Sequence, residues 1–257
     1  MILLLGGTKD SRDLTRRLIE SNFPVTVSVT SQYGSELIED NVLINKTPLD
    51  KDGLTKYIDE HRISFIADAS HPYAAKVSAN AMDVAAKLGI PYVRYERPSI
   101  VLPDYEQLYQ TCDYAEAAKV ASTLGKTIFL TTGSRHLAIF KKSTFLKNHR
   151  IIARVLPEPT VVSECINLGF QPCDIVALQG PFTHDLNTAL FKAYNADVII
   201  TKNSGTIGGT DAKISAAIAL HIPILIINRP SLSYHTLFTS LDDTLNYIRG
   251  NYKLCNL

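Results

Sequence analysis

The sequence has almost no net charge, because 26 Lys and Arg residues stand against 25 Asp and Glu residues and leave a formal net charge of only +1. Without a global positive field we expect no binding to nucleic acid, and affinity for an anionic ligand has to come from cations placed locally. The chain also lacks an apolar run near the length of about 18 residues that a membrane span needs. Residues 1–5 are apolar but have neither the basic flank nor the length of a signal peptide. We therefore expect a cytoplasmic protein with no membrane partner.

Cysteine is scarce as well. The four cysteines, Cys112, Cys165, Cys173 and Cys255, show no CxxC spacing. A chain of 257 residues can bury a substantial core without disulfides. We therefore expect reduced cysteines buried as small hydrophobes, and no protein-bound metal.

What the chain does have is a steady alternation of apolar strand patterns with helical patterns, in a composition that is 46% hydrophobic and 20% charged. This alternation predicts an α/β fold made of two Rossmann-like, doubly wound domains with parallel sheets and a cleft between them. The expected division is a cofactor domain over residues 1–98, a crossing segment over 99–126 and a substrate-side domain over 127–257. Substrate is expected in the cleft.

Residues 201–213 form the most informative loop of the sequence, and we expect this loop to join a buried strand to a helix. Its three glycines permit tight turns and close approach to a ligand, and the following helix offers free N–H groups and the positive end of its dipole. Lys202 and Lys213 flank it. Glycines alone indicate only a strand–helix turn with solvated lysines, but glycines, hydroxyls, Asn203 and two cations together favour an anion site.

Gly6, Gly7 and Thr8 form a second turn of this kind, between an apolar strand at residues 2–5 and a helical pattern. The arrangement suits the phosphates of a dinucleotide. It is weaker than a complete GxGxxG motif because the third glycine is absent, and Gly-Gly-Thr is also common in structural turns.

The strand predicted over residues 24–30 ends without the acidic residue that usually binds the ribose hydroxyls of NAD. Thr30 and Ser31 stand there instead, so a 2′-phosphate would not be repelled. This absence favours NADPH, with Arg12 or Arg16 as candidate partners.

Residues 68–74 follow another predicted strand, at the edge where open α/β sheets bind ligands. Pro72 suits the first position of a helix, with Ser70 or His71 as the cap, and capping alone would explain Ser70 and Pro72. His71 is in addition a candidate for hydrogen bonding or proton transfer.

Nine short motifs occur in order along nearly the whole chain. They are LLLGGT at 3–8, DASHPYA at 68–74, GIPY at 89–92, RYERP at 94–98, TTGSR at 131–135, QGPF at 179–182, KNSG at 202–205, GGT at 208–210 and AK at 212–213. In their order and spacing, these motifs resemble the precorrin-6A reductase family of corrin (vitamin B12) biosynthesis, including its cobalt-precorrin-6A branch.

The resemblance implies hydride transfer from NADPH or NADH to the C18–C19 double bond of an acidic tetrapyrrole. We favour the branch that acts on the cobalt complex, which is usually associated with NADH, whereas the metal-free branch uses NADPH. Other enzymes of the corrin pathway are possible partners. Two remote alternatives are a nucleotide-sugar or acyl transferase, and a non-catalytic small-molecule-binding regulator.

Roles for individual residues follow from the family's chemistry combined with the predicted loops. His71 is the candidate proton donor, because the reduction needs a proton. Residues expected to bind the cofactor are Gly6, Gly7, Thr8, Thr30, Ser31 and Ser70. Residues expected to bind the carboxylates and body of the substrate are Arg97, Ser134, Arg135, Lys202, Asn203, Ser204, Gly205, Thr210 and Lys213.

Overall fold

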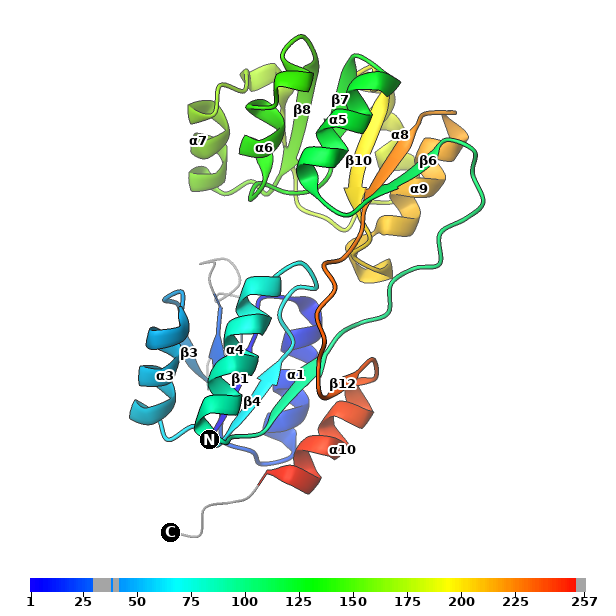
Figure 1. Cartoon of the computed structure of the whole chain (residues 1–257). Coiled ribbons are helices and arrows are strands. Elements are labelled where there is room, and N and C mark those ends of the chain that lie inside the picture. The colour runs from blue at the N-terminus through cyan, green and yellow to red at the C-terminus, as the bar shows by residue number, and fades with distance from the viewer. Residues whose placement is uncertain (30–37, 39–41, 253–257) are drawn as a thin grey trace. The chain divides into compact units, whose positions relative to one another are not determined.

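A computed structural model describes residues 1–29, 38 and 42–252 of the chain. These residues form two compact units (Figure 1). Unit 1 comprises Met1–Pro98 together with Pro230–Leu257, and unit 2 comprises Ser99–Arg229.

Unit 1 is a six-stranded sheet covered by helices on both faces. Its strands are β1 (Ile2–Leu5), β2 (Val25–Ser28), β3 (Leu43–Asn45), β4 (Phe65–Asp68), β5 (Tyr92–Tyr95) and β12 (Leu237–Phe238). Its helices are α1 (Lys9–Glu20), α3 (Lys51–Glu60), α4 (Ala75–Leu88) and α10 (Leu241–Asn251).

Alternation along β1 shows how this sheet is buried on both sides. Ile2 belongs to the core cluster that contains Leu14 of α1 and Ile248 of α10. Leu3, the next residue, belongs to the cluster that contains Leu54 of α3 and residues of α4. Successive side chains of a strand point to opposite faces, so a continuous apolar strand fits a sheet with helices on each face.

Unit 2 repeats this design. Its strands are β6 (Leu108–Thr111), β7 (Thr127–Leu130), β8 (Arg150–Val155), β9 (Ile175–Ala177), β10 (Val198–Lys202) and β11 (Ile224–Ile227). Its α-helices are α5 (Tyr114–Leu124), α6 (Leu137–Lys141), α7 (Pro159–Asn167), α8 (His184–Ala193) and α9 (Thr210–Ala219). The short 3₁₀ turns are η1 (Thr144–Leu146), η2 (Pro172–Asp174) and η3 (Thr206–Gly208).

Both sheets are parallel and have the doubly wound strand order. Unit 1 runs β12-β5-β4-β1-β2-β3 and unit 2 runs β6-β11-β10-β7-β8-β9. Unit 1 has the Rossmann arrangement 3-2-1-4-5-6, and in unit 2 strands β7 to β11 take its first five positions while β6, the first strand in sequence, takes the sixth. The predicted fold class, two Rossmann-like α/β units, is confirmed.

The sixth strand of each sheet comes from an unexpected part of the chain. The segment after β5 supplies β6, which pairs with β11 in unit 2. The segment after β11 supplies β12, which pairs with β5 in unit 1. The expected boundaries need correction accordingly, because residues 230–257 complete unit 1 and the expected crossing segment 99–126 contains a strand and a helix of unit 2.

Two smaller expectations are also wrong. Helix α4 begins at Ala75, and its N-cap Ala74 makes no side-chain cap hydrogen bond, so Pro72 is not helical and Ser70 and His71 are not caps. The residue before proline is kept from helical geometry, which is consistent with this later start. Cys165 is buried as expected, but Cys112 and Cys173 are exposed.

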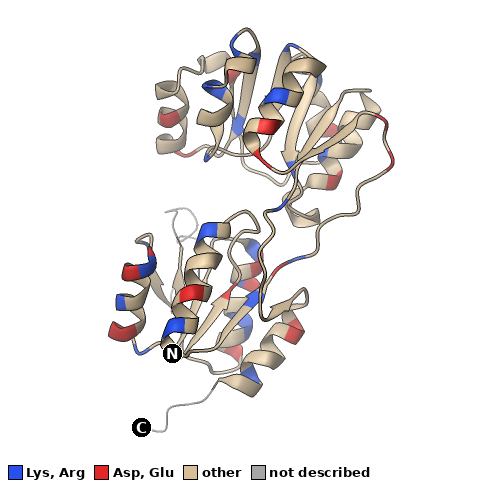
Figure 2. Cartoon of the chain, viewed as in Figure 1, with Lys and Arg blue, Asp and Glu red and all other residues tan. Residues whose placement is uncertain are grey.

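Acidic and basic residues occur on both units (Figure 2), in keeping with the near-zero net charge. Within the described residues, no helix is both long and apolar enough to span a bilayer.

The completion of unit 1 by α10 predicts that Ile248→Ala destabilises the protein. Ile248 has no exposed surface and belongs to the core cluster of β1 and α1. Its truncation should lower the free energy of unfolding by about 2–4 kcal/mol, measured by urea denaturation. Asn246→Ala on the exposed face of the same helix is the control and should change it by about 0.5 kcal/mol or less. Equal effects of the two variants would contradict the placement of α10.

Candidate functional site

The candidate ligand-binding residues lie where the strand order of each sheet reverses. In unit 1 this point falls between β1 and β4, which are hydrogen-bonded neighbours. In unit 2 it falls between β7 and β10. Open parallel sheets bind ligands outside the carboxyl ends of strands at this point. The loops after these four strands contain most of the predicted site residues.

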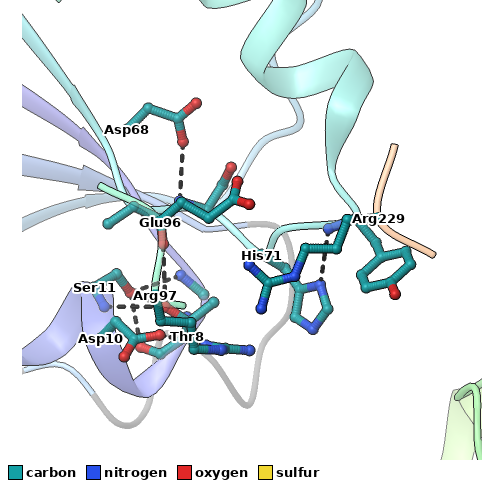
Figure 3. Close-up of polar contacts among 12 residues, drawn as sticks. Thr8, Asp10, Ser11, Asp68, His71, Glu96, Arg97 and Arg229 are labelled. Atoms are coloured by element: carbon teal, nitrogen blue, oxygen red, sulfur yellow. Dashed lines mark hydrogen bonds and ion pairs between the residues drawn. The ribbon is translucent and has the colours of Figure 1, made fainter. Parts of the chain in front are cut away.

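The glycine turn of unit 1 leads directly into α1. Thr8 is the N-cap, and its Oγ1 accepts a hydrogen bond from the Ser11 backbone N–H at 3.0 Å. Ser11 Oγ in turn accepts from the N–H groups of Gly7 and Thr8, at 3.1 and 3.0 Å. Gly7 has φ of +103°, a conformation that favours glycine. The turn is thus held by a capping box, and the Thr8 hydroxyl also donates to the Ala69 carbonyl in the loop after β4 (Figure 3).

Arg97 forms an ion pair with Asp10 in the first turn of α1 (Figure 3). Both side chains are buried. Asp10 would repel an anion at this helix N-terminus, and the guanidinium neutralises it. The structure therefore puts Arg97 beside the glycine turn of unit 1, where it is engaged by a carboxylate of the protein.

A second buried network fixes the ends of β4 and β5. Arg94 is fully buried and donates to Asp68 Oδ1 at 2.7 Å, to Glu96 Oε2 at 3.0 Å and to Ser70 Oγ at 3.0 Å. Tyr92 donates to the other Asp68 oxygen at 2.7 Å. Burial opposes the charge of Asp68, but Arg94 and the hydrogen bonds to this carboxyl together outweigh burial and lower its pKa. Ser70, expected at the cofactor, is here a member of this network.

His71 is partly buried and follows directly on that network. Its Nδ1 accepts a hydrogen bond from the Tyr73 backbone N–H at 3.2 Å. When the ring is neutral, its proton is therefore on Nε2. Thr30 and Ser31, the residues expected at the ribose, lie outside the described residues.

In unit 2 the loop between β10 and α9 is shorter than expected. Lys202 is the last residue of β10, and α9 already begins at Thr210. The Thr210 hydroxyl accepts from the Ser204 N–H at 3.1 Å and donates to the Lys202 carbonyl at 3.0 Å. A Cβ on Gly208 would lie 2.4 Å from that of Ser204, so this crossing requires glycine. Thr210 therefore closes the loop that also contains Ser204 and Gly205.

Asn203 is held within unit 2. Its side-chain oxygen accepts from the Ile100 N–H and its amide donates to the Ile100 carbonyl, both at 3.1 Å. The Arg229 guanidinium donates to the Asn203 backbone carbonyl at 2.8 Å. Asn203 thus anchors the segment that enters unit 2.

Four cationic or titratable groups gather around the switch point of unit 2. Burial, then Arg135, lowers the pKa of Lys202 to about 8. Burial, then Arg154 and Lys202, lowers the pKa of Lys213 to about 7. His136 has its pKa lowered by burial, Lys202 and Arg135, and its ring stacks on Tyr114 at 3.9 Å between centroids. Arg135 thus acts on Lys202, and Lys202 acts on Lys213 and His136, so neighbouring members of this group lie within electrostatic reach of one another.

Residues of this group differ in solvent exposure and in their hydrogen bonds. Arg135 is exposed, and the Ser134 carbonyl accepts from the Leu137 N–H at 3.1 Å. Lys213 is 7% exposed and donates to the Gly208 carbonyl at 2.8 Å. The structure thus brings Ser134, Arg135, Lys202 and Lys213 to one edge of unit 2, whereas Arg97 belongs to unit 1.

Sequence analysis missed Arg154, near the end of β8. It is 5% exposed, and burial lowers its pKa to about 10. Since β8 pairs with β7, this guanidinium belongs to the same part of the sheet as the lysines. A signal was present, because Arg154 interrupts the apolar run of residues 151–155. A charge inside such a strand has to be paired or functional.

Electrostatically, unit 2 offers a ligand several cations and a glycine loop, which suit an anionic molecule. No group of three or more His, Cys, Asp or Glu suited to a metal ion occurs in the part of the chain that the structure describes.

These two parallel sheets, with loops at both switch points, define a doubly wound α/β protein of the kind that binds dinucleotides and other anionic ligands at strand ends. Comparison with known proteins identifies the family. The family model for "Precorrin-6x reductase CbiJ/CobK" matches residues 1–249. The chain belongs to this family, and it is therefore a reductase of cobalamin biosynthesis.

Relatives agree with this placement. A cobalt-precorrin-6A reductase of Priestia megaterium is 38% identical, over 96% of this chain and 97% of its own length. A precorrin-6A reductase of Rhodococcus erythropolis is 35% identical, over 90% of each chain. A solved structure of a CobK precorrin-6A reductase matches with a TM-score of 0.79 and 24% identity, covering 97% of this chain and 96% of that one, which supports the fold.

Burial of the Lys213 ammonium predicts a pH-dependent stability. The unfolded chain keeps this proton up to about the ordinary value of 10.5, and the folded chain keeps it only up to about 7. Between these values the unfolded state binds more protons, so the free energy of unfolding rises with pH across this window. Lys213→Met should remove that part of the rise and stabilise the protein at pH 6 by on the order of 1–3 kcal/mol. Denaturant titrations at several pH values measure it, and a loss of stability at pH 6 would contradict the unfavourable burial.

Proposed function

We propose that this protein reduces cobalt-precorrin-6A by transferring a hydride from a reduced nicotinamide cofactor to the C18–C19 double bond of the macrocycle. The observation that carries the proposal is membership of the precorrin-6x reductase family along almost the whole chain. The relative from Priestia megaterium, whose length the match covers nearly completely, has the cobalt form of the substrate in its name.

The second candidate is reduction of metal-free precorrin-6A with NADPH. The relative from Rhodococcus erythropolis has that substrate in its name and is of similar identity. The missing acid after the second strand of unit 1 also favours NADPH, because a carboxylate there would repel the 2′-phosphate. We therefore propose NADPH as the preferred cofactor, whichever form of the macrocycle is used.

We propose that unit 1 binds the nicotinamide cofactor. Support comes from Gly6, Gly7 and Thr8 at the switch point, directly before the positive end of α1. The Arg97–Asp10 pair beside this turn prevents an uncompensated carboxylate from opposing the cofactor's phosphates. The cofactor supplies the hydride, and the protein's task is to hold it close to and aligned with the acceptor carbon.

We propose that unit 2 binds the acidic macrocycle. Its acetate and propionate groups call for cations, and Arg135, Lys202 and Lys213 gather at the switch point of this unit. The lowered pKa values of Lys202 and Lys213 remove part of their charge at neutral pH, and a bound carboxylate would restore it. Ser134, Ser204 and Gly205 contribute loop groups, whereas Asn203 and Thr210 keep the loop in shape.

The reduction also needs a proton, for which we propose His71. With Nδ1 accepting from Tyr73, the neutral ring carries its proton on Nε2. The Arg94 network fixes the loop that begins at Ser70, and so limits how far His71 can move.

The test of the proposed function is anaerobic incubation of the protein with precorrin-6A or its cobalt complex and with NADPH or NADH. We expect nicotinamide oxidation coupled to reduction of the macrocycle, followed by absorbance. Absence of oxidation with all four combinations would exclude the reductase. Reaction of the metal-free form alone would select the second candidate.

Gly7→Val tests the cofactor site in unit 1. A branched side chain at φ of +103° intrudes where the backbone has to approach phosphate, so the Kd for the nicotinamide should rise about tenfold or more, roughly 1.4 kcal/mol. The matched control is Gly89→Val, which imposes a similar strain at φ of +67° at the end of α4. Fluorescence titration measures both proteins, and equal cofactor affinities would remove the site from this turn.

Variants of His71 and Lys202 separate chemistry from binding. His71→Asn should lower kcat by about 10²–10⁴ and leave the KM values nearly unchanged if the ring supplies the proton. Lys202→Ala should instead raise KM for the macrocycle by about tenfold, the loss of one charge-assisted hydrogen bond. A selective rise in KM for the nicotinamide would transfer Lys202 to the cofactor.

A further inference from the structure

Two strands of this protein contain a buried arginine, and the two guanidinium groups differ in whether a carboxylate pairs with them. Arg94 in β5 has ion pairs with Asp68 at 2.7 Å and Glu96 at 3.0 Å. Burial opposes its charge, but Asp68, Tyr234 and Glu96 together outweigh burial and raise the pKa of Arg94 above its ordinary value. Arg154 in β8 is buried to a similar degree, and no carboxylate among the described residues lies within ion-pair distance of it. Such a charge is costly unless something else pairs with it.

Neutral groups hold the Arg154 side chain in place. Its Nη1 donates to Asn187 Oδ1 at 2.8 Å, and its guanidinium carbon lies 4.0 Å from the centre of the Phe182 ring. Asn187 is fully buried and donates to the carbonyls of Phe182 and Thr183. One nitrogen and one face of the guanidinium are thus fixed. The remaining N–H groups of a planar five-donor fork stay suited to a carboxylate.

Lys213 is a second buried cation in this neighbourhood. Its only hydrogen bond in the described structure goes to the Gly208 carbonyl, and no carboxylate of the described residues forms an ion pair with it. Burial, then the charges of Arg154 and Lys202, lower the pKa of Lys213, and Asp211 offsets this only in part. Two cations that repel each other are therefore buried together.

The start of α9 adds polar donors to the same place. Gly209 is the N-cap of this ten-residue helix, and no side chain caps it. The Phe182 carbonyl lies 3.9 Å from where a Cβ of Gly209 would stand, so the residue on which Arg154 stacks adjoins this helix N-terminus. An uncapped helix N-terminus attracts a negative charge.

We propose that Arg154, Lys213 and the N-terminus of α9 form a binding subsite for one carboxylate group of the ligand. The carboxylate pairs with Arg154 as Asp68 pairs with Arg94. Its negative charge also offsets the repulsion between Arg154 and Lys213. Its identification as an acetate or propionate side chain of the macrocycle rests on the proposed function. The subsite makes Arg154 a determinant of which edge of the macrocycle enters unit 2.

A purely architectural role for Arg154 gives different expectations. In that case its contacts with Asn187 and Phe182 only hold the loop before α8, and its removal lowers stability without any selective effect on anions. The tests therefore measure anion response and KM as well as stability.

The first test needs no macrocycle. Thermal unfolding of the complete protein is compared in sodium acetate and sodium chloride at equal ionic strength and pH, with acetate as the probe. The wild type should have a higher Tm in acetate, because acetate binds the folded state only. Arg154→Met should lose this difference. Arg150→Gln is the matched control, since it removes an exposed arginine of the same strand that pairs with Asp174, and it should keep the difference.

The second test uses steady-state kinetics. Arg154→Met should raise KM for the macrocycle about ten- to a hundredfold, with KM for the nicotinamide unchanged. Arg154→Lys keeps the charge but not the planar fork, so it should show a smaller rise. If Arg154→Met does not fold, Arg154→Lys supplies both measurements.

The outcomes separate the subsite from the proposed function. A folded Arg154→Met protein with the acetate response of the wild type, or with an unchanged KM for the macrocycle, overturns the subsite. A wild type that reduces no form of precorrin-6A overturns the proposed function, while the acetate comparison still decides whether a carboxylate binds at Arg154.

Discussion

The ion pair between Arg94 and Asp68 is the interaction on which the organisation of unit 1 depends. It joins the carboxyl ends of two neighbouring strands inside a sheet that helices cover on both faces. Because the pair is buried, loss of one partner leaves an uncompensated charge, so the two strand ends are strongly coupled. Ser70 and Tyr92 hydrogen-bond to the same pair, and the loop of His71 starts from there. This polar network thus lies next to the candidate site and holds the loop of His71 without occupying the site.

Parallel sheets of this kind confine polar chemistry to their ends. Strands such as β1 and β11 are apolar on both faces, which leaves little room for a ligand along their length. Both units accordingly place hydroxyls, glycines and cations after the last strand residue. The two units differ in charge: the turn of unit 1 has a neutralised pair, and the switch point of unit 2 has cations in excess. This difference is consistent with a cofactor on one unit and a polyacid on the other.

Much of this architecture could be predicted from the sequence, since the apolar strands and the glycine turns are local signals. Strand β1 was predicted with its observed ends. The pairing of the two edge strands could not be predicted. Strands β6 and β12 are short, and they are recognisable only through their partners β11 and β5. The roles of Ser70 and Asn203 were missed for a similar reason. Their hydrogen-bond partners, Arg94 and Ile100, are distant in the sequence, and nothing in a local pattern indicates them.

The exchange of sixth strands also has a consequence for the order in which the protein is completed as it leaves the ribosome. Unit 2 is a continuous segment, so all its strands are present once residue 229 has emerged. Unit 1 begins first but still lacks β12 and α10 at that moment, and Leu245 and Ile248 of its core have not yet emerged. The edge of β5 is open until then, which is the kind of exposed strand edge that favours mispairing with other chains. The N-terminal unit is therefore the last to close, and a nascent chain stalled before residue 237 would present that edge.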